Sequence, residues 1–203
     1  MIDVPFAALL LAGGRSRRMG CDKALLDWHG QPMWMVQMAK LRALNPARLM
    51  IACRENQNIG RAVEVEWLYD PQGDELGPMG AIHRAWEVVK MPLLVLAVDM
   101  PWMTTSFMRD ELLGGVVNDG GFFIETDHGP EPLAGVYMPL MLERMRRSIE
   151  VNQLNLQRFV LEFGLARVRC AELHEVLFFS NTNTPAEWLH EKDRSVRPAS
   201  PNS

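Results

Sequence analysis

The segment from Leu11 to Lys23 combines glycines and positive charges in a spacing suited to binding phosphate. It reads LAGGRSRRMGCDK, with glycines at Gly13, Gly14 and Gly20 and cations at Arg15, Arg17, Arg18 and Lys23. Glycines let backbone N–H groups approach an anion closely, and clustered cations neutralise phosphate charge. The formal net charge of the chain is −4, so this cluster is a local exception. It predicts a polyphosphate-binding loop, with an exposed basic loop as the alternative.

This segment matches neither of the two common phosphate-binding motifs. A P-loop requires GxxxxGK[ST], whereas five residues separate Gly14 from Gly20 and Ala24 follows Lys23. A Rossmann fingerprint requires GxGxxG, which residues 13–18 do not supply. The sequence therefore predicts a third type of nucleotide-binding loop.

Three carboxylates are candidates for the same site. Asp99 follows the apolar run LLVLAV, and its oxygens suit Mg²⁺ held between phosphates; a turn or capping residue is the alternative. Asp70 precedes a proline, and it is interpreted either as an acceptor for guanine or ribose donors or as a turn former. Asp22 is interpreted as orienting Lys23 or an arginine, with a surface acid as the alternative.

Short apolar runs alternate with amphipathic segments, which predicts an α/β fold with a doubly wound, Rossmann-like, mostly parallel sheet. Such sheets bind ligands at the carboxyl ends of their strands. We expect one three-layer α/β/α domain over residues 1–193, followed by a disordered tail over 194–203 that is rich in Pro, Ser and Asn. Strands are expected at 6–12, 49–53, 64–69, 93–98, 121–125, 133–137 and 167–170. Helices are expected from 32 and 77, after a Thr/Ser cap at 104–106, over 139–149 and 153–163, and from a capping box at 184–187.

Composition excludes several other classes of protein. The 203 residues suit one α/β domain, and 21 basic against 25 acidic residues argue against a nucleic-acid partner. No apolar run reaches the length of a membrane span. The cysteines Cys21, Cys53 and Cys170 are far apart and form no CxxC pair, which predicts a reducing cytoplasm and no structural zinc site.

The pattern LAGGxSxRMGxDKALL at 11–26 resembles the molybdenum cofactor guanylyltransferase family, which belongs to the nucleotidyltransferases with a nucleotide-diphospho-sugar transferase, or glycosyltransferase-A-like, fold. The resemblance extends over about residues 5–190. Further landmarks follow in the family's order: Asp70, Gly77-Pro78, Asp99-Met100-Pro101, Pro132-Leu133-Ala134 with Tyr137, and Asn181-Thr182-Asn183-Thr184-Pro185.

The resemblance implies a reaction in which GMP passes from GTP to molybdenum-loaded molybdopterin and pyrophosphate is released, with Mg²⁺ as cofactor. Proteins that insert molybdenum or receive the finished cofactor are the implied protein partners. The implied site residues are Arg18, Lys23 and Asp99 for catalysis, Asp99 also for the metal, Leu11, Ala12, Gly13, Gly14, Lys23, Asp70 and Asp99 for the nucleotide, and Pro132, Asn181 and Asn183 for the pterin.

Two departures from the family pattern concern the base. No Asn aligns cleanly after the second expected strand, and the small residues of the Gly-Pro-Leu-x-Gly-Ile turn are exchanged at 77–82. The nearest alternative is a CTP-using molybdopterin cytidylyltransferase, but those relatives usually carry Leu-Ala-Ala-Gly, whereas this chain has Leu-Ala-Gly-Gly, which leaves room for a purine. A sugar-phosphate or isoprenoid-precursor nucleotidyltransferase and a non-catalytic nucleotide-binding adaptor are the remaining alternatives.

Overall fold

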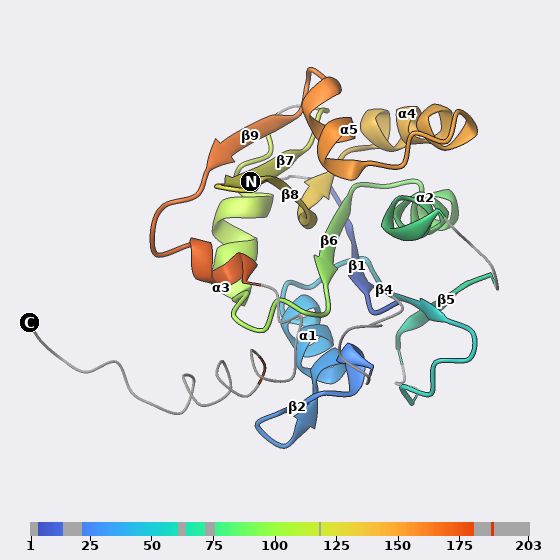
Figure 1. Ribbon diagram of the computed structural model, residues 1–203, viewed down its shortest axis with the longest axis vertical. Coiled ribbons are helices and arrows are strands. Elements are labelled where there is room, and N and C mark those ends of the chain that lie inside the picture. The colour runs from blue at the N-terminus through green and yellow to red at the C-terminus, as the bar shows by residue number, and fades with distance from the viewer. Residues whose placement is uncertain are drawn as a thin grey trace, which may run out of the picture.

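A seven-stranded sheet forms the centre of the molecule (Figure 1). It is seen in a computed structural model that describes residues 4–13, 22–60, 64–71, 76–117, 119–180 and 188. The strands of this sheet, from one edge to the other, are β5 (Glu66–Asp70), β4 (Arg48–Arg54), β1 (Ala7–Leu11), β6 (Leu93–Ala97), β8 (Gly129–Tyr137), β7 (Phe122–Thr126) and β9 (Arg167–Cys170).

The half of the sheet that contains β1 is parallel. β1 pairs in parallel with β4 and β6, and β4 pairs in parallel with β5. β8 runs antiparallel to β6 and β7, and β9 is parallel to β7. The prediction of a mostly parallel sheet is therefore confirmed, and the carboxyl ends of β5, β4, β1 and β6 meet at one edge.

Helices cover both faces of the sheet (Figure 1). One face carries α1 (Met33–Arg42) and α3 (Thr105–Phe107), which continues as the π-helix Met108–Leu113; the other carries α2 (Gly77–Val89), α4 (Pro139–Glu150) and α5 (Leu156–Glu162). Alternate residues of a strand point to opposite faces, so Ala8 and Leu10 pack in the first core while Ala7 and Leu9 pack in the second. This arrangement confirms the predicted three-layer architecture.

The expected strands and helices between residues 6 and 170 are present, with shifted ends. β8 begins at Gly129 rather than at residue 133, because Gly129 and Pro130 pair with β7 in a hairpin whose glycine and prolines hide the strand pattern. The helix expected from 153 begins at Leu156, after Asn155 caps it by accepting a hydrogen bond from the Arg158 N–H at 2.9 Å.

Four short elements were not predicted from the sequence. They are the 3₁₀ helices η1 (Lys23–Leu25) and η3 (Val176–Phe179) and the two strands of a hairpin, β2 (Asp27–Trp28) and β3 (Gln31–Pro32). The capping box at 184–187 and the boundary at 193 lie outside the described residues, so both stay predictions. Within the described part of the chain, no helix is long and apolar enough to cross a bilayer.

The buried hydroxyl of Tyr137 gives a stability prediction. Tyr137 is fully buried in β8, and its hydroxyl donates to the Pro132 carbonyl at 2.7 Å. Tyr137→Phe leaves that carbonyl without its donor, so the free energy of unfolding should fall by about 1–3 kcal/mol in a denaturant titration. Tyr69, which is 40% exposed, supplies the matched control, and Tyr69→Phe should change little. Equal effects of the two substitutions would contradict the prediction.

Candidate active site

The carboxyl end of β1 lies between its two neighbouring strands. The Leu11 carbonyl accepts from the Val98 N–H at 3.0 Å, and the N–H groups of Ala12 and Gly13 donate to the Ala52 carbonyl at 2.9 and 3.0 Å. The predicted nucleotide-binding residues Leu11, Ala12 and Gly13 therefore lie at the edge where such sheets bind ligands. Two of their N–H groups already hold the strand end in place. Gly14 lies outside the described residues.

An ion pair joins two of the three predicted catalytic residues. Lys23, in η1, lies 76 residues from Asp99 in the sequence, yet Lys23 Nζ and Asp99 Oδ2 are 2.7 Å apart. The side chains are 15% and 19% exposed, and partial burial strengthens their interaction relative to a pair in open water. Arg18, the third predicted catalytic residue, is not among those described.

Helix α1 fixes the turn that carries Asp99. The Gln37 side chain is fully buried, and its amide donates to the Met100 carbonyl at 2.6 Å. One turn further along, Lys40 Nζ donates to the Pro101 carbonyl at 2.8 Å. The backbone on the carboxyl side of Asp99 is therefore held by two side-chain donors.

Asp70, at the end of β5, reaches the same edge. A Cβ added to Gly13 would lie 2.8 Å from Asp70 Oδ2, so the carboxylate rests against the backbone where the predicted phosphate loop begins, and a larger residue there would displace it. Arg84 of α2 forms an ion pair with Asp70. The structure thus places Asp70 beside the predicted nucleotide residues, and its role with guanine or ribose stays a prediction.

Asp22 pairs with an arginine, which is one of the two roles predicted for it. Asp22 Oδ2 accepts from Arg54 Nη2 at 2.9 Å, and Asp22 Oδ1 accepts from the Ala24 N–H at 3.0 Å, which caps η1. Arg54 and Arg84 were not predicted from the sequence. The sequence held a usable signal for Arg54, because this residue follows the strand expected at 49–53 and therefore lies at the expected ligand edge. For Arg84 the sequence showed only that it belongs to the helix expected from residue 77.

Three ion pairs thus line this edge among the residues described: Lys23–Asp99, Arg54–Asp22 and Arg84–Asp70. Each predicted carboxylate faces a cation. When a polyphosphate binds, the lysine and arginine side chains can pair with its phosphates instead of with the aspartates. A bound metal ion can likewise replace the cation that pairs with an aspartate. In both exchanges one ionic partner replaces another. The arrangement suits a reaction on phosphate groups.

Cys53 lies among these charges but is not a nucleophile at neutral pH. Burial, with the negative charges of Asp70 and Asp22 as smaller causes, raises the pKa of the Cys53 thiol to about 11. The thiolate is the reactive form of cysteine. The thiol is therefore neutral under ordinary conditions, and Cys53 supplies no nucleophile.

The donor set at Asp99 suits magnesium better than zinc. Within the part of the chain that the structure describes, no three His, Cys, Asp or Glu residues gather in a group able to hold a metal ion. Zinc sites usually supply three or four such ligands, whereas Mg²⁺ is usually bound by one or two carboxylates together with water and substrate phosphates. Asp99 fits the second pattern.

Pro132 lies at the same edge of the sheet as Asp99. Ala134 of β8 pairs with Leu96 of β6 in antiparallel register, so residue 132 extends past the end of β6 in the direction of Asp99. The Pro132 side chain is buried, and its carbonyl accepts the Tyr137 hydroxyl. The other two predicted pterin residues, Asn181 and Asn183, lie outside the described residues.

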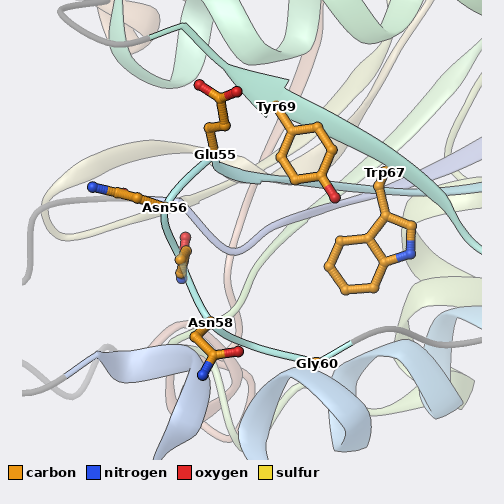
Figure 2. Close-up of a pocket in the computed structure, with 7 residues that line it drawn as sticks. Glu55, Asn56, Asn58, Gly60, Trp67 and Tyr69 are labelled. Carbon is orange, nitrogen blue, oxygen red and sulfur yellow. The ribbon is translucent and has the colours of Figure 1, made fainter.

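A cavity of about 350 Å³ lies beyond the end of β4. Figure 2 shows the loop over residues 55–60 on one side of it and the rings of Trp67 and Tyr69 on the other. The loop contributes Glu55 and three amide side chains, and none of the described residues that line the cavity is a lysine or an arginine. The cations of the described site lie instead at the ion-paired edge, where a triphosphate can pair with them. Gln57 connects the two, since it lines the cavity and also bonds to Ala12 and Asp22.

The architecture matches solved nucleotidyltransferase structures. The molybdopterin-guanine dinucleotide biosynthesis protein A from Archaeoglobus fulgidus superposes with a TM-score of 0.73 at 20% identity, covering 93% of this chain and 98% of that chain. A nucleotidyl transferase from Methanothermobacter thermautotroptrophicus superposes with a TM-score of 0.76 at 14% identity, covering 94% and 97%. At such identities the match establishes the fold, which is that of the nucleotide-diphospho-sugar transferases.

Sequence comparison places the chain more narrowly within this class. A relative from Pseudomonas putida, named molybdenum cofactor guanylyltransferase, is 28% identical over 89% of this chain and 94% of its own length. One from Synechococcus elongatus, named probable molybdenum cofactor guanylyltransferase, is 28% identical over 90% of this chain and 96% of its own length. The family model for the MobA-like NTP transferase domain matches residues 8–176. The chain belongs to this family and is a nucleotidyltransferase.

The partly buried amine of Lys40 predicts a pH dependence of stability. Burial lowers the pKa of Lys40 from 10.5 to about 8, so between these values the unfolded chain binds a proton that the folded chain lacks. The free energy of unfolding should therefore rise with pH across that window, by at most about 3 kcal/mol from this group. Denaturant titrations at pH 7.5 and 10 should show a smaller rise in Lys40→Met than in the wild type. The same rise in both proteins would show that Lys40 titrates normally.

Proposed function

We propose that this protein transfers GMP from GTP to molybdenum-loaded molybdopterin, forming the guanine dinucleotide form of the cofactor and releasing pyrophosphate. The observation that carries the proposal is the Lys23–Asp99 pair, held at the carboxyl ends of β1 and β6 in a member of the MobA-like NTP transferase family. Relatives named molybdenum cofactor guanylyltransferase that align over nine-tenths of the chain support the choice of substrates.

The reaction needs no covalent enzyme intermediate. An oxygen of the terminal phosphate of the pterin attacks the α-phosphorus of GTP in line, a new P–O bond forms, and the bond to the β-phosphate breaks with pyrophosphate as the leaving group. Lys23, and in our proposal Arg18, neutralise charge on the α-phosphate and the leaving pyrophosphate. Catalysis is then positioning and electrostatic stabilisation.

Asp99 would hold Mg²⁺, with the phosphates of GTP and water supplying the other ligands. When bound, the ion supplies Lewis-acid charge stabilisation on the phosphate oxygens. The residues of this chain do the remaining work. Lys23 moves its charge from the carboxylate to phosphate as the nucleotide binds, while Gln37 and Lys40 keep the Asp99 turn in place.

We assign the nucleotide to the edge where Leu11, Ala12, Gly13, Gly14 and Asp70 lie, and the pterin to the side of Pro132, Asn181 and Asn183. Asp70 can accept hydrogen bonds from guanine or ribose, because a carboxylate offers two acceptor oxygens. Proteins that insert molybdenum and proteins that receive the cofactor are its proposed partners. We place the enzyme in the cytoplasm, because Cys53 and Cys170 are free thiols.

The choice between nucleotides is the first prediction of the proposal. Purified protein is incubated with Mg²⁺, molybdopterin and either GTP or CTP, and pyrophosphate release is followed. GTP should give the faster turnover, because the relatives that align over about nine-tenths of the chain are named guanylyltransferases. Turnover with CTP that equals or exceeds that with GTP would overturn the guanylyl assignment, and turnover with neither in a protein that binds GTP would favour the adaptor.

The Lys23–Asp99 pair gives a second prediction. Lys23→Ala should lower kcat by about 10²–10³-fold, as loss of a positioned charge does at comparable sites. Asp99→Asn keeps the size of the side chain but loses the charge and replaces one acceptor oxygen by an NH₂ donor, so it should raise the Mg²⁺ concentration needed for half-maximal rate. Arg144→Ala, an exposed change on α4, is the control. Unchanged Mg²⁺ dependence in Asp99→Asn would remove Asp99 from the metal site.

A further inference from the structure

We infer that Gln57 is a positioning residue for nucleotidyl transfer: its side chain ties the end of β1 to Asp22, and thereby sets Lys23 opposite Asp99. The inference deepens the proposed function and rests on it for its kinetic test. Gln57 lies in the loop that follows β4. Its amide is not one of the groups that the proposed reaction uses directly.

The hydrogen bonds of Gln57 use both N–H donors of its amide and also the amide oxygen. Gln57 Nε2 donates to the Ala12 carbonyl at 2.8 Å and to Asp22 Oδ1 at 3.0 Å, while Gln57 Oε1 accepts from the Arg54 N–H at 3.0 Å. The residue is 9% exposed. Two acceptors therefore face its nitrogen and one donor faces its oxygen. Only a neutral primary amide of this length matches that pattern.

Asp22 passes the constraint on to Lys23. Asp22 Oδ1, which Gln57 contacts, also caps η1 by accepting from the Ala24 N–H at 3.0 Å. Helix η1 is a single turn of three residues that begins at Lys23. So short an element has little orientation of its own, and its direction follows its cap. The Lys23 side chain then reaches Asp99 Oδ2 at 2.7 Å.

Gln57 also fastens the strand end that the nucleotide is expected to meet. Its bonds to the Ala12 carbonyl and to Asp22 Oδ1 hold the end of β1 next to the start of η1, although Ala12 and Asp22 are ten residues apart in the sequence. The loop of Gln57 turns its other face to the cavity of Figure 2. Gln57 thus connects the end of β1, the cap of η1 and the end of β4.

Gln57→Glu tests the inference with almost no change in shape. An ionised Glu would face two acceptors, Ala12 O and Asp22 Oδ1, and repel both; a protonated Glu can donate to one of them. At pH 8 the kcat of the variant should therefore be about 10- to 100-fold lower than that of the wild type, which is the loss expected for misplaced catalytic groups. The ratio of the two kcat values should return towards unity as the pH falls towards 5.5. The recovery appears mainly in kcat, because Lys23 acts on charge that develops in the transition state.

Matched variants separate positioning from folding. Asn58→Asp makes the same charge change at the next position, which is exposed and lines the same cavity, and its kcat ratio should stay near unity at every pH. Gln57→Ala should lose rate with no recovery at low pH. All rates are measured well below each variant's Tm. A Gln57→Glu ratio that does not change with pH, or one that Asn58→Asp reproduces, would overturn the inference.

A structural readout makes the test independent of the proposed reaction. Crystal structures of Gln57→Glu at pH 5.5 and pH 8 should show Lys23 opposite Asp99 at the lower pH and displaced from it at the higher. An unmoved Lys23 at pH 8 would overturn the positioning role even if the rate falls. A wild-type protein without turnover on GTP or CTP would count against the proposed function alone, and the Lys23 position would still decide the role of Gln57.

Discussion

The parallel alignment of β5, β4, β1 and β6 is the constraint on which the site depends. Because these strands run the same way, the residues that follow each of them arrive at one edge of the sheet. β1 and β6 are buried along their full length between two layers of helices, so a shift of one residue in their register would move apolar side chains to the wrong core. The hydrophobic pairing of the sheet thereby fixes where Gly13, Asp70 and Asp99 can lie.

The edge so formed is charged but balanced. Lys23, Arg54 and Arg84 each neutralise an aspartate, so no carboxylate of the three is buried without a cation. Burying an unpaired charge is costly, and this pairing allows the site to exist before substrate arrives. A nucleotide with a divalent ion brings both signs of charge, and it can exchange with these pairs without leaving a group unneutralised.

The fold was largely predictable from the sequence, and the partners within the site were not. Continuous apolar runs such as 93–98 identify buried parallel strands by composition alone, and the glycines and cations of 11–23 mark the phosphate edge. The sequence also led to Lys23 and Asp99 separately. Their contact, and the pairing of Asp70 with Arg84, depend on strand order, which no local pattern encodes. The short η1 and the β2–β3 hairpin escaped because two or three residues carry no periodicity.

Donors that take no part in the ion pairs keep this geometry in place. Gln37 and Lys40 hold the turn after Asp99, and Gln57 holds the turn after β1 together with the cap of η1. An amide bonded to a backbone carbonyl has no net charge to lose to an arriving phosphate, whereas Lys23 and Asp99 must both change partners. Because the charged side chains of this site change their ionic partners during the reaction, the backbone that carries them must be held by hydrogen bonds that stay the same. The two buried glutamines supply hydrogen bonds of this kind, and neither is marked in the sequence, because a single glutamine between polar or apolar neighbours has no motif.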